Sequence, residues 1–357
     1  MASISPAGTA RPQTGGRLQN YPADSRAFDW LAVLTSAWFL GGLFLDGWAH
    51  NHIAELESFF TPWHAVLYSG FFSVGSLMVY TQYRNVGRGY AWSRALPRGY
   101  FPTLIGCVLF LIGGVGDMLW HEIFGIEQNI EALFSPTHLL LASGAFLFVS
   151  GPLRAAWGRA GLRGWRDLLP PILSMLMTFS LVTFFLQYAS IWGNPGFLTE
   201  RSSGNYFFNV TSVAAILIPA ALMVGALLML LRRWTLPFGT ATLLFTVNAA
   251  LMVLMRFDFA AEYWRVLVAA AAGGLLTDGL IAALKPSLSR PGALRLVAFA
   301  APFAVFLLTM GAVALTDQRG LYWPIHMWLG VPFVAGAIGL LLSFLVAPPP
   351  VPDEAQG

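Results

Sequence analysis

Long apolar runs alternate with short polar connections along almost the whole chain. An apolar run of about 20 residues can cross a bilayer as a helix. The runs lack the apolar–polar alternation of strands, and lipid tolerates no unpaired backbone groups, so each run predicts a membrane-spanning helix. We therefore expect an all-α fold, a polytopic transmembrane helical bundle of about ten spans. The predicted spans are residues 28–47, 62–82, 100–121, 136–152, 169–191, 207–231, 236–255, 264–284, 296–315 and 322–346.

The basic residues predict an orientation for these spans. Cytoplasmic connections of membrane proteins carry an excess of Lys and Arg. With the N-terminus in the cytoplasm, the inner segments contain 16 of the 20 Lys and Arg residues. The remainder are Arg201, Arg256, Arg265 and Arg319. We expect an integral protein of a bacterial-type cell membrane with both termini in the cytoplasm.

The chain divides into two helical units between two polar ends. Residues 1–26 lack the apolar core of a signal peptide, so we expect them to form a disordered cytoplasmic tail instead. Residues 27–152 predict a duplicated, metal-binding unit of four helices, and residues 153–347 a second unit of about six spans. The Pro-rich residues 348–357 predict a second disordered tail.

The composition excludes several classes of protein. The chain is 57% hydrophobic and 10% charged, whereas soluble domains carry about 25% charged residues. This composition excludes a soluble enzyme, a disordered protein and a nucleic-acid-binding protein. The sequence pI of about 9.2 reflects a net charge of only +3, which the arginines of the connections supply. Cys107, the single cysteine, lies in an apolar run and excludes an internal disulfide framework.

Chemically active side chains are concentrated in two outward connections, residues 46–64 and 117–138. These connections hold five of the six histidines and seven of the 17 acidic residues. Ionisable groups close to the membrane are costly and favour a functional interpretation. A solvated acidic loop would account for the acidic residues alone, but not for the histidines that accompany them.

The two connections repeat the same polar pattern. The first reads Asp46-Gly-Trp-Ala-His50 and then Glu57-Ser-Phe-Phe-Thr-Pro-Trp-His64, and the second reads Asp117-Met-Leu-Trp-His121 and then Glu131-Ala-Leu-Phe-Ser-Pro-Thr-His138. The aspartates and the first histidines are both offset by 71 residues (117 − 46 and 121 − 50), and the glutamates and last histidines by 74 (131 − 57 and 138 − 64). The pattern predicts an internal duplication with three extra residues in the second loop.

The spacing within each copy suits a metal ion. Asp and His at positions i and i+4 share one helix face. Thr-Pro or Ser-Pro predicts the start of the returning helix, with the hydroxyl residue as N-cap and the last histidine at N3. Two imidazoles and a carboxylate favour copper, zinc or non-haem iron over calcium or magnesium. The predicted ligands are Asp46, His50 and His64 in the first copy and Asp117, His121 and His138 in the second.

Glu57 and Glu131 are the candidate catalytic residues. Each is either a fourth ligand or an acceptor that orients a histidine N–H, and could tune the metal or relay protons. The sequence leaves open whether the two copies form one dinuclear site or two mononuclear sites.

The order of ligands, their spacing and the Thr-Pro turn resemble the copper-ligand segment of the C subunit of particulate methane and ammonia monooxygenases. The resemblance covers roughly residues 28–152. It implies copper at Asp46, His50 and His64 and at Asp117, His121 and His138. Asp117 stands where the family has Asn, and the six later spans have no counterpart that we recognise. The family works with two partner subunits, one of which bears a soluble copper domain.

The resemblance implies a copper-dependent membrane monooxygenase that hydroxylates a small apolar substrate from the lipid bilayer. Its partners would be further monooxygenase-type subunits or an external electron donor, and its metal sites would face the periplasm or cell exterior. Two alternatives stay open. One is a non-enzymatic membrane protein that binds or transfers copper or another divalent metal. The other is a zinc-dependent membrane hydrolase, with Glu57 or Glu131 as the base.

The second half of the chain predicts less chemistry. Asp278 lies in the middle of a predicted span, so we expect it to face a cavity or a partner helix. His326 lies at the outer start of the last span, where an interfacial histidine is the favoured interpretation.

Overall fold

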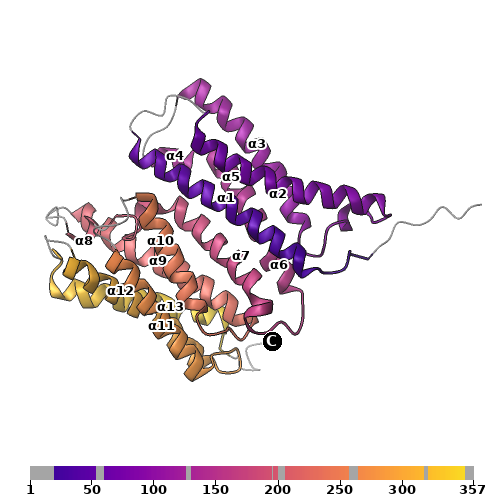
Figure 1. The fold of residues 1–357 in the computed structure, drawn as a ribbon. Coiled ribbons are helices and arrows are strands. Elements are labelled where there is room, and N and C mark those ends of the chain that lie inside the picture. The colour runs from indigo at the N-terminus through magenta and orange to yellow at the C-terminus, as the bar shows by residue number, and fades with distance from the viewer. Residues whose placement is uncertain are drawn as a thin grey trace, which may run out of the picture.

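The computed structural model describes residues 20–53, 60–125, 130–194, 196–199, 206–256, 264–316 and 321–349, and these residues contain helices but no strand (Figure 1). The predicted tails therefore fall mostly outside the described residues. The longer helices are α1 (Arg26–His52), α2 (Pro62–Gly87), α3 (Phe101–Phe124), α5 (Pro136–Val149), α7 (Gly164–Phe185), α9 (Tyr206–Arg233), α10 (Thr240–Arg256), α11 (Trp264–Leu284), α12 (Pro291–Thr316) and α13 (Ile325–Val346). The shorter helical segments are η1 (Trp92–Arg94), α4 (Glu131–Phe134), α6 (Gly151–Trp157), η2 (Gln187–Ala189) and α8 (Gly196–Thr199).

Seven of these helices, α1, α3, α7, α9, α11, α12 and α13, are long and apolar enough to cross a membrane. They indicate an integral membrane protein. The other three predicted spans do not meet these criteria of length and apolarity as single helices. Helix α2 carries hydroxyl and amide side chains along its length and is not among the seven. Helix α10 has only 17 residues, and α5 and α6 form a pair bent by 43°.

Helix α7 lies at the centre of the bundle, between α1 to α6 on one side and α9 to α13 on the other (Figure 1). In its most apolar stretch 78% of the residues are buried. It packs against α1, α5, α6, α9 and α10. The amide of Asn248 on α10 donates hydrogen bonds to the hydroxyl groups of Ser180 at 3.2 Å and Thr183 at 2.7 Å on α7. These bonds satisfy polar groups that would be costly to bury unpaired.

The α1–α2 pair and the α3–α5 pair pack in the same way. In both pairs two glycines let the partner backbone approach so closely that an added Cβ atom would lie within about 3 Å of it. The contacts are Gly42 with Leu67 and Gly70 with Phe39 in the first pair, and Gly113 with Leu141 and Gly144 with Phe110 in the second. Equivalent contact residues on α1 and α3 are 71 positions apart, and those on α2 and α5 are 74 positions apart. These are the same offsets as in the repeated polar pattern.

Asp278 on α11 faces a partner helix. Its carboxylate accepts hydrogen bonds from the backbone N–H groups of Ala241 at 3.0 Å and Thr242 at 2.9 Å, and from the Thr242 hydroxyl at 2.7 Å. These groups belong to the first turn of α10, which has no intrahelical partners for its N–H groups. Asp278 therefore caps α10 from a neighbouring helix.

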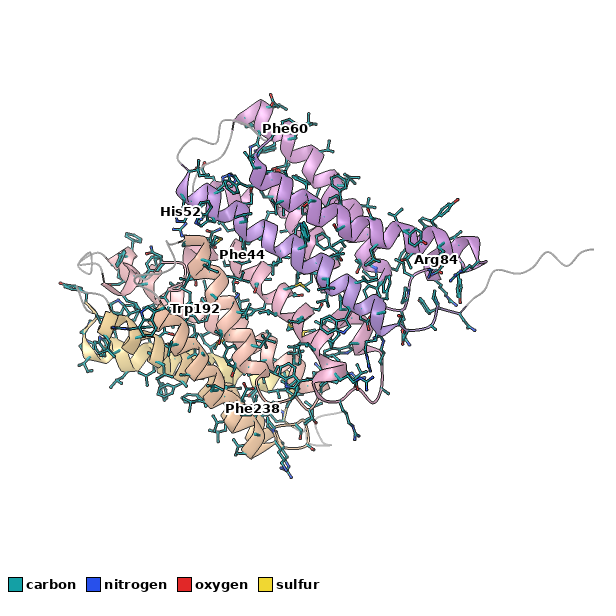
Figure 2. All side chains as sticks on the ribbon, in the orientation of Figure 1. Phe44, His52, Phe60, Arg84, Trp192 and Phe238 are labelled. Atoms are coloured by element: carbon teal, nitrogen blue, oxygen red, sulfur yellow. The ribbon has the colours of Figure 1, made fainter. Side chains whose placement is uncertain are left out.

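The ends of the bundle differ in chemistry. Figure 2 shows His52 and Phe60 at one end and Arg84 and Phe238 at the other. Near the Arg84 end, the buried Asp29 accepts a hydrogen bond of 2.7 Å from the hydroxyl of Tyr100 and pairs with the Arg159 guanidinium. This network ties the start of α1 to the start of α3 and to the connection between α6 and α7.

Candidate metal centres

Two local turns place the last histidine of each copy. Thr61 precedes α2 and accepts a hydrogen bond of 3.1 Å from the backbone N–H of His64. Ser135 precedes α5 and accepts one of 3.2 Å from the backbone N–H of His138. Both helices have Pro at their first position, where its missing N–H costs nothing. The predicted capping and the position of both histidines are confirmed.

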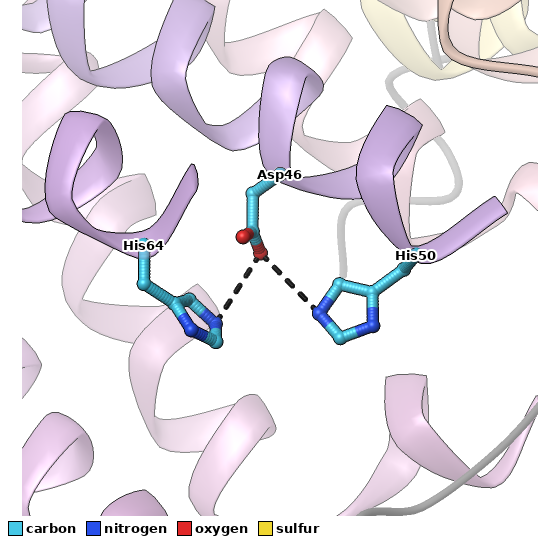
Figure 3. A group of neighbouring side chains, drawn as sticks. All are labelled: Asp46, His50 and His64. Carbon is cyan, nitrogen blue, oxygen red and sulfur yellow. Dashed lines mark ion pairs between the residues drawn. The ribbon is translucent and has the colours of Figure 1, made fainter. Parts of the chain in front are cut away.

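In the first set, the side chains of Asp46, His50 and His64 converge from the ends of α1 and α2 (Figure 3). Nε2 of His50 lies 3.7 Å and Nε2 of His64 lies 3.5 Å from Oδ2 of Asp46. One potential ligand atom from each residue lies within 4.8 Å of the other two. Ligands about 2 Å from a shared ion are roughly 3–4 Å apart, so the set is close to the geometry that one ion requires.

In the second set, Asp117, His121 and His138 converge from α3 and α5 in the same way. Nε2 of His121 lies 3.4 Å from Oδ2 of Asp117, and Nδ1 of His138 lies 3.4 Å from Oδ1. The three ligand atoms again lie within 4.8 Å of one another. Asp117 is 2% exposed, so its carboxylate needs a partner inside the protein.

One tautomer of His121 suits metal coordination. Nδ1 lies 3.3 Å from the carbonyl oxygen of Gly125. In the tautomer that donates to this carbonyl from Nδ1, Nε2 holds the lone pair that coordination requires, 3.4 Å from Oδ2 of Asp117. The donor set therefore fits a bound metal ion.

A chain of hydroxyl groups supports the second set. Thr137 donates a hydrogen bond of 2.8 Å to Oδ1 of Asp117 and lies 3.2 Å from the hydroxyl oxygen of Ser135, which lies 2.6 Å from Nδ1 of His138. Because a carboxylate only accepts hydrogen bonds, the Thr137 hydroxyl is the donor to Asp117. Ser135 lies between Thr137 and Nδ1 of His138, so the two hydroxyl groups link the Asp117 carboxylate to the histidine.

The first set lacks this chain. The residue equivalent to Thr137 is Trp63, which has no hydroxyl. Among the described residues, Oδ1 of Asp46 is buried without a hydrogen-bond partner. A buried carboxylate oxygen left unpaired is costly, and coordination to a cation would satisfy it.

The two sets are neighbours, and Tyr68 lies beside both. The Asp46 carboxylate is close enough to Asp117 and His138 for Coulombic interaction, and the Tyr68 phenol is close enough to both aspartates. The Tyr68 ring lies 6.3 Å from the His64 ring, and its hydroxyl packs against Gly114 on α3. Tyr68 is not among the residues predicted from the sequence, although its position four residues after His64 places both on one face of α2.

Two tryptophans adjacent in sequence to the first set contact each other. Trp48 lies edge-on to Trp63 with ring centroids 5.8 Å apart, and it stacks on His52 at 4.8 Å. Nδ1 of His52 donates to the Trp48 carbonyl at 2.8 Å, so His52 stands beside the set and outside it.

Among the described residues, Glu131 and His326 are not members of the groups that could hold a metal ion. Glu57 lies outside the described residues. Glu131 begins α4 and is exposed, and His326 is exposed on the first turn of α13.

No protein-family model, curated protein or solved structure matches the chain.

Proposed function

We propose that the chain is a copper-dependent integral membrane monooxygenase-like protein, with one ion in each Asp/His/His set. The observation that carries this proposal is the convergence of two identical donor sets, each with two imidazoles and one carboxylate, at the same end of the helical bundle. Zinc and iron are the other ions that such donors suit. The resemblance of residues 28–152 to the copper-ligand segment of the monooxygenases favours copper.

The ligands would be Asp46, His50 and His64 in one set and Asp117, His121 and His138 in the other. Bound copper would supply one-electron chemistry with dioxygen. The protein would fix the ligand orientations through Thr61, Ser135 and Thr137, and would restrict water through Trp48 and Trp63. Glu57 and Glu131 would relay protons to and from the two sets.

The topology belongs to the same proposal. If α2, the bent pair α5–α6 and α10 cross the bilayer together with the seven apolar helices, the chain has ten spans. The charge distribution then places both termini in the cytoplasm and both donor sets on the outer side. A small apolar substrate would reach the sets from the bilayer, and an external electron donor or a further subunit would supply electrons.

Metal analysis of the purified protein tests the assignment. We expect two copper ions per chain in the wild type by elemental analysis, with a cupric signal in electron paramagnetic resonance. The double variant His50→Ala/His121→Ala removes one ligand from each set and should lose the metal. The matched control His52→Ala/His326→Ala removes two histidines that lie outside the sets and should keep it. Full metal retention in the first variant would defeat the proposal.

Oxygen consumption separates the enzyme from a metal carrier. We expect the copper-loaded protein with a small-molecule reductant to consume dioxygen in the presence of an apolar substrate, and the His50→Ala/His121→Ala variant not to. Copper binding without substrate-dependent oxygen uptake would favour metal binding or transfer. Zinc in place of copper would favour a hydrolase.

A further inference from the structure

The last turns of α1 have two working faces. Asp46 and His50 lie four residues apart and point into the first donor set, and Gly47 and Asn51 repeat that spacing one residue later. Helix α1 packs against α7 and α10. At Gly47 the approach is so close that an added Cβ atom would lie 2.6 Å from Cε2 of Phe184 on α7. The face beside the ligands therefore contacts the later helices.

Arg256 at the end of α10 holds the Asn51 side chain. Its Nη1–H donates a hydrogen bond of 2.5 Å to Oδ1 of Asn51. A guanidinium only donates, so the amide oxygen must face it. Nδ2 of Asn51 is then free to donate to the carbonyl oxygens of Gly47 at 2.6 Å and Met255 at 3.5 Å. The Asn51 amide thus bonds to the preceding turn of α1 and to α10 at once.

The same guanidinium reaches a third element. Nε of Arg256 donates a hydrogen bond of 3.2 Å to the carbonyl oxygen of Gly193, in the connection between α7 and α9. The donors of a guanidinium form a rigid planar fork, so this side chain holds α1 and the connection in one fixed relation. Among the described residues, Arg256 forms no ion pair with a carboxylate. Neutralising a neighbouring acid therefore does not account for it.

The place of His50 near a helix end explains why this support matters. Helix α1 ends at His52, and the last turn of a helix frays where tertiary contacts are few. The His50 side chain is 41% exposed, so packing alone does little to fix the imidazole. A metal ligand has to stay within about 0.5 Å of its productive position. The bond at Asn51, the next residue along the chain, restrains this turn.

The second copy has no equivalent of this contact. The residues 71 positions after Gly47 and Asn51 are Met118 and Glu122. Glu122 is exposed, and an acid there is an acceptor without the amide's donor group. The second set instead has the hydroxyl group of Thr137 on its aspartate. Each set is therefore supported by a different device, and Arg256 serves only the first.

We infer that Arg256 is a positioning residue for the first donor set, acting through Asn51 to fix the His50 imidazole. The inference rests on the proposed function, since it concerns an ion held by Asp46, His50 and His64. It goes beyond that proposal because it makes the later helices part of the metal-binding apparatus.

Copper titration of the full chain in the His121→Ala background tests the inference, because only the first set is intact there. Arg256→Met removes both donor groups and should weaken copper binding about 10-fold, the lower end of the effect of losing a partner that orients a ligand. The hyperfine splitting of the cupric electron paramagnetic resonance signal should change as well, because a displaced imidazole alters the ligand field. Arg256→Lys keeps one donor and should retain more of the affinity.

A double-mutant cycle shows whether Arg256 acts through Asn51. Asn51→Ala should weaken copper binding as Arg256→Met does, and the double variant should be no weaker than the weaker single variant, because both remove the same contact. Arg265→Met is the matched control, since Arg265 donates to the Leu315 carbonyl on α12 at 2.7 Å. It should change neither affinity nor spectrum. Additive losses in the cycle, or an unchanged spectrum in Arg256→Met, would overturn the inference.

Hydrogen exchange of the metal-free full chain in lipid nanodiscs gives a second readout. Arg256→Met and Asn51→Ala should each speed exchange in the peptide of residues 46–53 about 10-fold, the effect of losing a hydrogen bond to a charged group. The equivalent peptide of residues 117–124 should exchange as in the wild type. Asn51→Ala, the milder change, serves if Arg256→Met does not fold.

The two readouts separate this inference from the proposed function. A wild type without metal would refute the proposed function, and faster exchange of residues 46–53 would still support the hold of Arg256 on the His50 turn. Bound metal with unchanged affinity and unchanged exchange in the Arg256 and Asn51 variants would overturn this inference alone.

Discussion

Thr137 donates a hydrogen bond of 2.8 Å to Oδ1 of Asp117, and the first donor set has Trp63 at the equivalent position. The two copies therefore have the same types of candidate ligand but differ in the groups that surround the carboxylate. One aspartate is held by a hydroxyl chain. The other has a buried oxygen that no donor among the described residues reaches. The two sets should consequently differ in affinity and in their response to substitution.

Thr137→Val should weaken metal binding at the second set about 10–100-fold, the usual effect of losing a partner that orients a ligand. The titration is cleanest in the His50→Ala background, where the first set is disabled. Thr35→Val is the control, because the Thr35 hydroxyl bonds the Leu31 carbonyl of its own exposed helix turn at 2.9 Å. Equal affinities for the Thr137 and Thr35 variants would show that the hydroxyl chain has no role in binding.

Gly70→Ala and Gly144→Ala should each lower the free energy of unfolding by about 1–3 kcal/mol, the usual cost of overpacking. The added Cβ atom would lie 2.5 Å from Cα of Phe39 in the first case and 2.7 Å from the backbone nitrogen of Phe110 in the second. Thermal unfolding in one detergent measures the change.

Gly41→Ala is the control for this pair, because an added Cβ atom at Gly41 would meet nothing within 4 Å. Ala is a better helix former than Gly by about 1 kcal/mol, so this variant should match or exceed the wild type. Destabilisation by Gly41→Ala equal to that by Gly70→Ala would contradict the close packing of α1 and α2.

Tyr100 should make the protein less stable at high pH. Burial removes water from the phenolate, and Asp29 repels its charge and accepts the hydrogen bond of the phenol, so the pKa of Tyr100 is raised well above its usual value. The unfolded chain loses this proton near pH 10, while the folded protein keeps it. Stability is thus fully present below about pH 10 and falls as the pH rises further.

Unfolding measured across this alkaline range should show a smaller pH slope for Tyr100→Phe than for the wild type. Tyr83→Phe alters a tyrosine that is 79% exposed and should leave the slope unchanged. An identical slope in the wild type and both variants would rule out a raised pKa at Tyr100.

Asp278→Ala should lower the free energy of unfolding by about 0.5–2 kcal/mol, since it removes the acceptor for the first N–H groups of α10. Asp278→Asn keeps one oxygen acceptor and should cost less. Asp167→Ala breaks an ion pair with Arg26 at the surface, which is worth about 0–1 kcal/mol, and one hydrogen bond of 3.3 Å from the backbone N–H of Arg163. A loss for Asp278→Ala no larger than for Asp167→Ala would argue against the capping role.

The sequence by itself determined the features that depend on neighbours along the chain. Apolar runs specify helices because lipid leaves the backbone no other way to satisfy its hydrogen bonds. The i, i+4 spacing of Asp46 and His50, and the caps at Thr61 and Ser135, are equally local. The break between α5 and α6 also had a local signal, since Pro152 follows Gly151 and interrupts the helical ladder.

Only the tertiary structure decided how distant segments meet. Four features arise where separate helices pack: the central position of α7, the place of Tyr68 beside both aspartates, the bond from Thr137 to Asp117 and the bond from Arg256 to Asn51. Each depends on the angle and rotation of one helix against another, which are set by the sum of many weak side-chain contacts and leave no periodic trace in a single sequence.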